Sequence, residues 1–227
     1  MSKRLLWQQI PSPIVSEIFC SSGVDGVVLD TEHACFNKET LFSCIQIITC
    51  WKRECFVRLG NLDDSMVRFC LDAGATGLIF STVESVTQTE KIMNLCKYPQ
   101  YSGKRGLGLV RQNRWGLDQL VSPPPTIIAQ IETLKGVDNI QKLKGFDFYM
   151  IGPYDLSASM GIPGNFQDQK FLDALTRVGN SIPVGKMAVH IPCDVHNEIK
   201  KYKNYGIIAV GMDTIALVES CKEMKNA

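Results

Sequence analysis

The 227-residue sequence lacks the features of several specialised protein classes. Its 24 Lys and Arg and 23 Asp and Glu leave a formal net charge of only +1, which indicates neither a nucleic-acid partner nor an anionic membrane surface. No apolar run approaches the length of a membrane span, and the first residues, MSKRLLWQQIPSP, contain no apolar core of a signal peptide. We therefore expect a soluble, cytoplasmic protein with no nucleic-acid or membrane partner.

Disulfide and zinc frameworks are also missing. The nine cysteines are odd in number and scattered, and no two form a C-x-x-C pair. Most lie inside apolar runs, where a reduced cysteine behaves as a small hydrophobic residue. This usage indicates a reducing compartment, and it argues against zinc held by Cys and His.

What the sequence does contain is a regular series of short apolar runs. Apolar residues make up 45% and charged residues 21%, as in an ordinary globular domain, and the length suits one domain spanning residues 1–227. Several runs are apolar at consecutive positions, which is typical of parallel strands covered on both faces. Eight strands are predicted: Leu5–Gln9, Gly26–Asp30, Cys55–Leu59, Thr76–Ser81, Thr126–Ile131, Asp147–Ile151, Val184–Val189 and Gly206–Gly211.

Amphipathic stretches separate most of these strands, and a glycine turn precedes four of them. We expect helices at Lys38–Ile48, Asp63–Ala73 and Asp194–Tyr205, and a short final helix at Thr214–Met224. The segment from Ser102 to Pro125 is rich in glycine, arginine and proline, and is interpreted as an elaborated loop that follows a strand.

The positions of polar residues favour a closed (β/α)₈ barrel over a doubly wound open sheet. Asp30, Arg58, Glu132 and Asp155 each fall at or just past the carboxyl end of a different predicted strand. In a barrel these ends converge on one face, where active sites are built, whereas an open sheet would spread them along a crevice.

The strand that ends at Asp30 leads directly into Thr31, Glu32 and His33. Helix capping by this group is one interpretation. The other is proton transfer, for which His33 at the catalytic rim is suited. Arg58 needs a partner at the end of its apolar strand, and either a structural carboxylate or a substrate oxyanion would serve.

Glu132 and Asp155 are candidate metal ligands. Each follows an apolar strand, and carboxylates of fixed direction are what a hard divalent cation requires. Oxygen ligands favour Mg²⁺ or Mn²⁺. Either residue alone could instead cap the helix that follows it. The loop Lys104–Arg114 could contact an acidic substrate or could be structural, and His190 and His196 have no partner readable from spacing.

Longer motifs then resemble a known family. GVDGVVLDTEHACF, FVRLGNLDD, LDAGATGLIFSTVES, AQIETLKGVDNI, IGPYDLSASMG and AVGMDT occur in the order typical of the HpcH/HpaI family of class II pyruvate aldolases, and the similarity covers nearly the whole chain. The resemblance implies a barrel of the phosphoenolpyruvate/pyruvate-binding type. It also implies a divalent cation (Mg²⁺, Mn²⁺ or Co²⁺) and a lyase that reversibly cleaves a 4-hydroxy-2-oxo acid to pyruvate and an aldehyde.

The same resemblance implies roles for individual residues. Glu132 and Asp155 correspond to the metal ligands, and Arg58 to the arginine that stabilises the pyruvate enolate. His33 with Asp30 corresponds to the acid/base and water-orienting group. The backbone around Gly152, Tyr154 and Asp155 corresponds to the site of the pyruvate carboxylate. Asp72 corresponds to an aspartate that contacts a neighbouring subunit's histidine. A homo-oligomer, trimeric or hexameric, is expected. Two other interpretations stay open: a citrate-lyase-β-like enzyme that acts on an acyl-CoA through the Lys104–Arg114 loop, and a non-catalytic barrel subunit.

Overall fold

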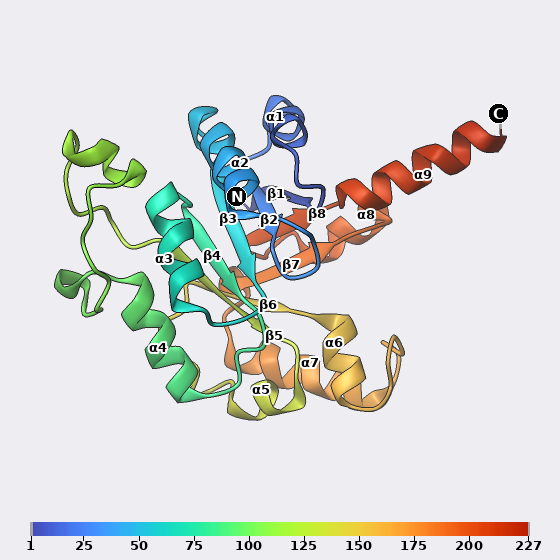
Figure 1. Cartoon of the computed structure of the whole chain (residues 1–227). Coiled ribbons are helices and arrows are strands. Elements are labelled where there is room, and N and C mark those ends of the chain that lie inside the picture. The colour runs from blue at the N-terminus through green and yellow to red at the C-terminus, as the bar shows by residue number, and fades with distance from the viewer. Residues whose placement is uncertain (1, 227) are drawn as a thin grey trace.

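The computed structural model describes residues 2–226 and forms a closed barrel of eight parallel strands (Figure 1). Each strand pairs with the next in sequence, and β8 pairs with β1. The predicted (β/α)₈ barrel is therefore confirmed. The strands are β1 Lys3–Gln8, β2 Gly26–Asp30, β3 Glu54–Leu59, β4 Gly77–Phe80, β5 Thr126–Ile131, β6 Phe148–Ile151, β7 Met187–Ile191 and β8 Ile207–Val210.

Helices follow the strands and cover the outside of the barrel (Figure 1). They are α1 Pro13–Ser21, α2 Lys38–Cys50, α3 Asp64–Ala73, α4 Val86–Cys96, α5 Leu134–Asn139, α6 Pro153–Ser159, α7 Gln169–Ser181, α8 Val195–Glu198 and α9 Asp213–Asn226. Four 3₁₀ turns complete the described elements: η1 Pro99–Tyr101, η2 Arg111–Gly116, η3 Val184–Lys186 and η4 Ile199–Tyr202. None of the helices within residues 2–226 is both long and apolar enough to cross a membrane.

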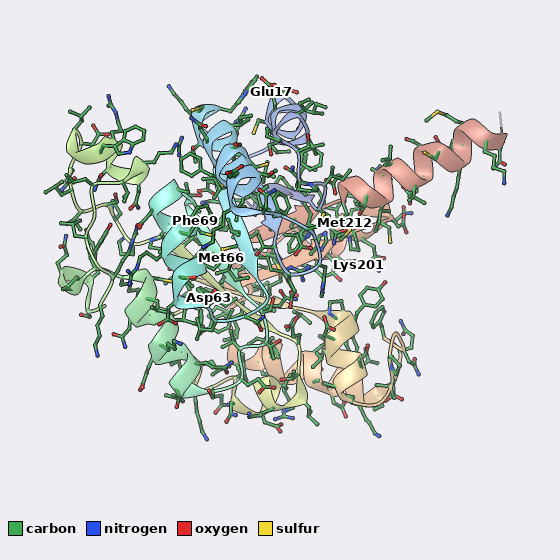
Figure 2. The ribbon with its side chains drawn as sticks, viewed as in Figure 1. Glu17, Asp63, Met66, Phe69, Lys201 and Met212 are labelled. Atoms are coloured by element: carbon green, nitrogen blue, oxygen red, sulfur yellow. The ribbon has the colours of Figure 1, made fainter. Side chains whose placement is uncertain are left out.

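Two buried layers hold the barrel together. One side-chain cluster fills the barrel interior and includes Trp7, Phe56 and Met150, and a larger one lies between the sheet and the helices. Met66 and Phe69 of α3, labelled in Figure 2, pack against the larger cluster. Consecutive residues of a strand thus enter opposite apolar layers, which explains the uninterrupted apolar runs in the sequence.

Several element boundaries differ from those expected. Residues 184–186 form a 3₁₀ turn, so β7 starts three residues later than predicted. The helix expected at Asp194–Tyr205 is a four-residue α8 followed by η4, and Asp194 before it has a left-handed φ of 47°. The expectation of a short final helix was wrong: α9 has fourteen residues and extends away from the barrel (Figure 1).

The start of α9 binds the residues that follow β1. The Asp213 carboxylate accepts hydrogen bonds from the backbone N–H groups of Gln9 (2.9 Å) and Ile10 (2.8 Å). These bonds fix the residues that follow β1, and so position the Gln9 side chain at the mouth of the barrel.

Candidate active site at the carboxyl ends of the strands

A buried ion pair between β2 and β3 forms the centre of the site. Asp30 and Arg58 are register partners at the ends of these strands. Arg58 donates from Nε to Asp30 Oδ1 (3.0 Å) and from Nη2 to Oδ2 (2.6 Å). Burial alone would raise the pKa of Asp30, but the hydrogen bonds and positive charge of Arg58 outweigh it and lower the pKa to about 2.

Asp30 has no free acceptor capacity for a substrate. Its Oδ2 also accepts from the Trp7 indole N–H (3.2 Å) and the Gln9 amide (3.0 Å). Its Oδ1 accepts from the backbone N–H groups of Glu32 (3.1 Å) and His33 (3.2 Å). An ionised carboxylate with six donors neither takes up a proton near neutral pH nor orients a further water. The structure therefore makes Asp30 the residue that holds Arg58 in place.

Glu32 contacts Arg58 as well. Its Oε2 lies 3.0 Å from Arg58 Nη1 and accepts from Ser81 Oγ (2.6 Å), so Glu32 is part of the charged centre and not a helix cap. Three of the five guanidinium N–H groups thus face carboxylates, which leaves one N–H group without a carboxylate partner on each of Nη1 and Nη2. The His33 side chain is 57% exposed, with Nε2 4.0 Å from Glu32 Oε2, and it touches Asp30 only through its backbone.

Glu132 directly follows β5 and is 3% exposed. Its Oε1 accepts from the backbone N–H (2.6 Å) and hydroxyl (2.7 Å) of Thr82, and its Oε2 from the Gln130 amide (2.5 Å). Thr133, not Glu132, caps helix α5. Burial raises the pKa of Glu132. The hydrogen bonds from Thr82 act to lower this pKa, and the negative charges of Glu32 and Asp155 raise it further.

The turn from β6 into α6 supplies the second carboxylate. Gly152 precedes the helix, and Tyr154 and Asp155 lie exposed in its first turn. A Cβ atom on Gly152 would lie 2.6 Å from Glu132 Oε2 and 2.8 Å from Gln130 Nε2. Only glycine allows the backbone to approach the glutamate this closely.

Glu132 and Asp155 fit a divalent cation by their chemistry. Among residues 2–226 neither carboxylate forms an ion pair, while the one arginine of the site already faces two other carboxylates. Within residues 2–226, the buried Gln130 Oε1 beside Glu132 has no hydrogen-bond partner. No cluster of three or more His, Cys, Asp or Glu side chains that could hold a metal occurs in the described chain. Two carboxylates with open positions are, however, the ligand set that Mg²⁺ commonly uses together with substrate oxygens.

Part of this site opens onto a cavity of about 320 Å³ at the barrel mouth. Of the four strand-end residues, Arg58 and Asp155 line its wall, together with His33, Gly152 and Tyr154, whereas the buried Asp30 and Glu132 are not among the residues that line it. Further residues lie there that the sequence argument did not identify, among them Trp7, Gln9, Gln130, Met212 and His190. Trp7 and Gln130 fall inside predicted strands. Their position near the end of a strand was the only available signal.

His190 at the end of β7 stacks on Trp7, with ring centroids 4.1 Å apart and planes within 11°. Trp7 also lies under the Arg58 guanidinium, whose carbon is 5.0 Å from the ring centroid. Burial lowers the pKa of His190 to about 4 despite the bond to the Gly211 carbonyl (3.0 Å). The imidazole is therefore neutral, and Nε2 carries its proton because a carbonyl can only accept.

Asp72 lies at the other end of the barrel from the remaining predicted site residues. It is in the last turn of α3, before β4 begins, and pairs with Arg105 Nη2 at 2.8 Å. The interpretation of residues 102–125 as a loop that follows a strand was wrong. The segment follows helix α4 and precedes β5, so it lies at the amino ends of the strands.

Basic residues of this loop are held by the chain itself. Arg105 is 4% exposed, and Arg111 donates to the Ala73 carbonyl (2.7 Å) and to Thr49 Oγ1 (2.8 Å). In the single chain the Lys104–Arg114 loop therefore cannot contact a ligand in the cavity at the barrel mouth.

Comparison with known proteins agrees with this geometry. A family model described as HpcH/HpaI aldolase/citrate lyase matches residues 3–220. The chain belongs to the HpcH/HpaI aldolase/citrate lyase family. The resemblance in the sequence motifs is thereby confirmed, and similar curated relatives are named as aldolases.

Relatives in the HpcH/HpaI family are similar over most of their length. A hydroxypyruvate/pyruvate aldolase of Pseudomonas aeruginosa is 30% identical, over 96% of this chain and 85% of the relative. A 4-hydroxy-2-oxovalerate aldolase of Rhodococcus jostii is 28% identical, over 94% and 86%. A 4-hydroxy-2-oxo-heptane-1,7-dioate aldolase of Shigella flexneri is 29% identical, over 96% and 86%.

Solved structures show the same barrel. An HpcH/HpaI aldolase/citrate lyase family protein of Burkholderia cenocepacia superposes with a TM-score of 0.89 at 25% identity, and the match covers 99% of this chain and 93% of that one. The citrate synthase SbnG superposes with a TM-score of 0.84 at 26% identity, covering 99% and 92%.

Proposed function

We propose that this protein is a divalent-metal-dependent aldolase that reversibly cleaves a 4-hydroxy-2-oxo acid to pyruvate and an aldehyde. The observation that carries the proposal is the pair Glu132 and Asp155, two carboxylates without a cationic partner, beside an arginine locked in place by Asp30 and Glu32. The names of the curated relatives, all aldolases, support the reaction class.

Glu132 and Asp155 are the residues that would hold the cation, Mg²⁺ or Mn²⁺ by the preference of oxygen ligands. When bound, the cation supplies Lewis-acid polarisation of the carbonyl of a 2-oxo acid. The backbone around Gly152, Tyr154 and Asp155 would bind the carboxylate of pyruvate.

Arg58 stabilises the negative charge of the enolate. Its two unused N–H groups donate to the oxygen on which this charge develops, and its bidentate bond to Asp30 fixes their direction before the substrate arrives. Such preorganised donors typically contribute a factor of about 10²–10³ to the rate.

His33 is the group that moves the proton to or from the aldol oxygen. It is exposed at the rim of the cavity and its Nε2 lies close to the Glu32 carboxylate. Asp30 acts through its neighbours: it fixes the backbone of His33 as well as the side chain of Arg58.

We propose further that the working form is a homo-oligomer. Helix α9 extends from the barrel and exposes Leu217 (55%), Val218 (52%) and Met224 (69%), which is apolar surface that a second copy could cover (Figure 1). In such an assembly Asp72, remote from its own site, would reach a histidine of a neighbouring subunit. Light scattering of the purified protein tests the oligomeric state.

Aldol cleavage and addition with pyruvate and a panel of aldehydes, with and without Mn²⁺, test the reaction itself. Metal-dependent formation of 4-hydroxy-2-oxo acids is expected. Retention on immobilised CoA would instead support the lyase that acts on an acyl-CoA. Melting and pyruvate binding that ignore Mn²⁺ in the metal-stripped protein would support a non-catalytic barrel.

A further inference from the structure

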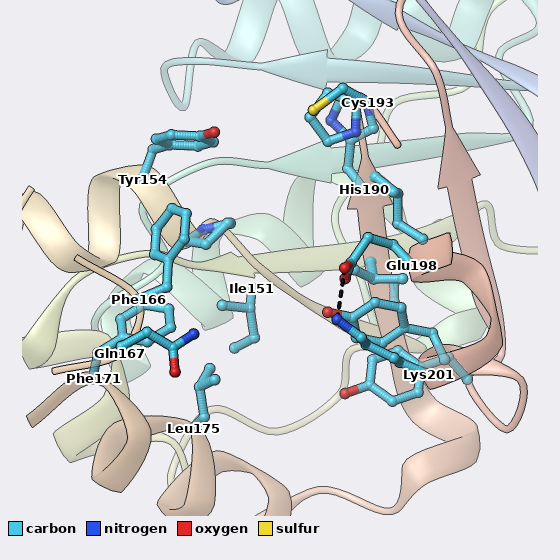
Figure 3. Close-up of a pocket in the computed structure, with 17 residues that line it drawn as sticks. Ile151, Tyr154, Phe166, Gln167, Phe171, Leu175, His190, Cys193, Glu198 and Lys201 are labelled. Carbon is cyan, nitrogen blue, oxygen red and sulfur yellow. Dashed lines mark hydrogen bonds and ion pairs between the residues drawn. The ribbon is translucent and has the colours of Figure 1, made fainter. Parts of the chain in front are cut away.

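A second cavity, of about 450 Å³, lies beside the barrel mouth, between strands β6 and β7 and the helices outside them (Figure 3). We call it the side chamber. Its inner surface is formed mainly by Ile151, Phe166, Phe171, Leu175, Val189 and Tyr205. Around most of the barrel, packed side chains fill the space between the sheet and the helices, so the presence of a cavity there needs a local cause.

The cause is a divergence of two strands. β6 and β7 are paired only at Tyr149 with Met187 and at Met150 with Ala188, whereas every other neighbouring pair of strands shares four or five such positions. Beyond Met150 the two strands separate. The cover is thin as well, because the helix after β7 has only four residues before η4 begins.

The side chamber adjoins the candidate active site. The two cavities share six wall residues: Ile151, Pro153, Tyr154, His190, Pro192 and Cys193. Tyr154 and His190 stand on opposite sides of this junction in Figure 3. Tyr154 is held there by an edge-on contact with Phe166, with ring centroids 5.1 Å apart. A substrate whose reacting carbon lies near Arg58 and Asp155 would reach the side chamber by extending past Tyr154.

The chemistry of the side chamber suits an uncharged chain. Aromatic rings line both of its sides, Phe166 packing on Phe171 (5.3 Å) and Tyr202 on Tyr205 (5.2 Å). Its charged wall residues are Glu198 and Lys201, and they pair with each other at 2.6 Å near the surface, as the dashed line in Figure 3 marks. A carboxylate inside would lose its water and find no free cation among the wall residues.

We propose that the side chamber binds an apolar, uncharged chain carried by the aldehyde carbon of the substrate. The preferred substrates are then 4-hydroxy-2-oxo acids with a hydrocarbon tail, and not dicarboxylic acids such as the one named for the Shigella flexneri relative. This inference rests on the proposed aldolase function. The volume lies within the range of about 300–1,000 Å³ that small-molecule sites occupy.

The first test measures kcat/KM for aldol addition of pyruvate to straight-chain aldehydes from acetaldehyde to hexanal, with Mn²⁺ present. Each CH₂ that becomes buried should raise kcat/KM by about fourfold. The charged aldehyde succinate semialdehyde is compared with 4-methylpentanal, which has a similar size and branching but no charge. We expect 4-methylpentanal to react at least tenfold faster. A flat length series, or a preference for the charged aldehyde, would overturn the inference.

The second test fills the side chamber. Leu175→Trp introduces a large ring into the wall, and the matched control Leu172→Trp makes the same change one turn earlier on α7, where the side chain is exposed. The measured quantity is the ratio of kcat/KM for hexanal to that for acetaldehyde. Leu175→Trp should reduce this ratio at least tenfold and Leu172→Trp should leave it within twofold. A ratio unchanged by Leu175→Trp would show that the tail binds elsewhere.

Val189→Phe fills the side chamber from the opposite wall and replaces Leu175→Trp if that variant melts well below the wild-type protein. Turnover of acetaldehyde separates the two possible failures. If acetaldehyde reacts but chain length has no effect, the side-chamber inference fails and the aldolase proposal stands. If no aldehyde reacts, with or without metal, both fail together.

Discussion

Replacement of the buried Asp30 by asparagine should destabilise the protein in a pH-dependent way. Aspartate has an ordinary pKa of 3.8, and Arg58 lowers that of Asp30 to about 2 in the folded protein. This difference corresponds to roughly 2 kcal/mol of stability at neutral pH. Because the Asp30 side chain is fully buried in the barrel mouth, solvent screening of the Asp30–Arg58 pair is small.

The sign of the pH dependence follows from the lowered pKa. The stabilisation is complete well above pH 3.8 and is lost as the pH falls toward 2, because the unfolded chain binds the proton first. By pH 3 roughly half of it, about 1 kcal/mol, should be gone. The difference in unfolding free energy between the wild-type protein and Asp30→Asn should therefore shrink by about that amount between pH 7 and pH 3.

Urea unfolding followed by circular dichroism, in a buffer containing EDTA, measures this difference at each pH. Asp138→Asn is the matched control, since Asp138 forms an ion pair of similar length with Arg177 (2.7 Å) but at the surface. It should cost less than about 1 kcal/mol at any pH. A difference between wild type and Asp30→Asn that stays constant from pH 7 to pH 3 would refute the assigned electrostatics.

Three further substitutions test the site. Gly152→Ala puts a methyl group 2.6 Å from Glu132 Oε2, so it should cost about 1–3 kcal/mol of stability and weaken the Mn²⁺ binding that calorimetry measures. The control Gly179→Ala, at an exposed position of α7 with no atom within 4 Å of the added methyl group, should have neither effect. Arg58→Lys keeps the charge but not the fork of donors, and should lower kcat for aldol cleavage by about 10²–10³; a loss of only a few fold would contradict its role. Glu132→Gln should abolish calorimetric Mn²⁺ binding while the protein remains folded, and unaltered binding would rule it out as a ligand.

The barrel could be predicted from the sequence because its signals are local. Each strand is a short apolar run, and the strand-end carboxylates and Arg58 stand out as charges where apolar residues would otherwise continue. Parallel strands in a closed barrel bring those ends to one face by geometry alone. That rule predicts that Glu132 and Asp155 lie on the same face of the barrel.

Other features depend on contacts that the sequence does not encode locally. The loop from Ser102 to Pro125 was placed at the wrong end of the barrel because its glycines and arginines resemble those of a ligand-binding loop, while its arginines in fact bind backbone carbonyls and Asp72. Trp7 and His190 are far apart in sequence and meet only by stacking across the barrel mouth. The side chamber arises from an early divergence of β6 and β7, which no residue pattern announces.

Exchange of the pyruvate methyl protons with D₂O, followed by ¹H NMR, tests the central claim most directly. It reports enolate formation without requiring the aldehyde to be known. We expect exchange in the presence of Mg²⁺, its loss on addition of EDTA, and a rate about 10²–10³ lower in Arg58→Ala. Exchange that persists in EDTA, or that proceeds at the wild-type rate in Arg58→Ala, would contradict the assignment of this site as a metal-dependent pyruvate-enolate site.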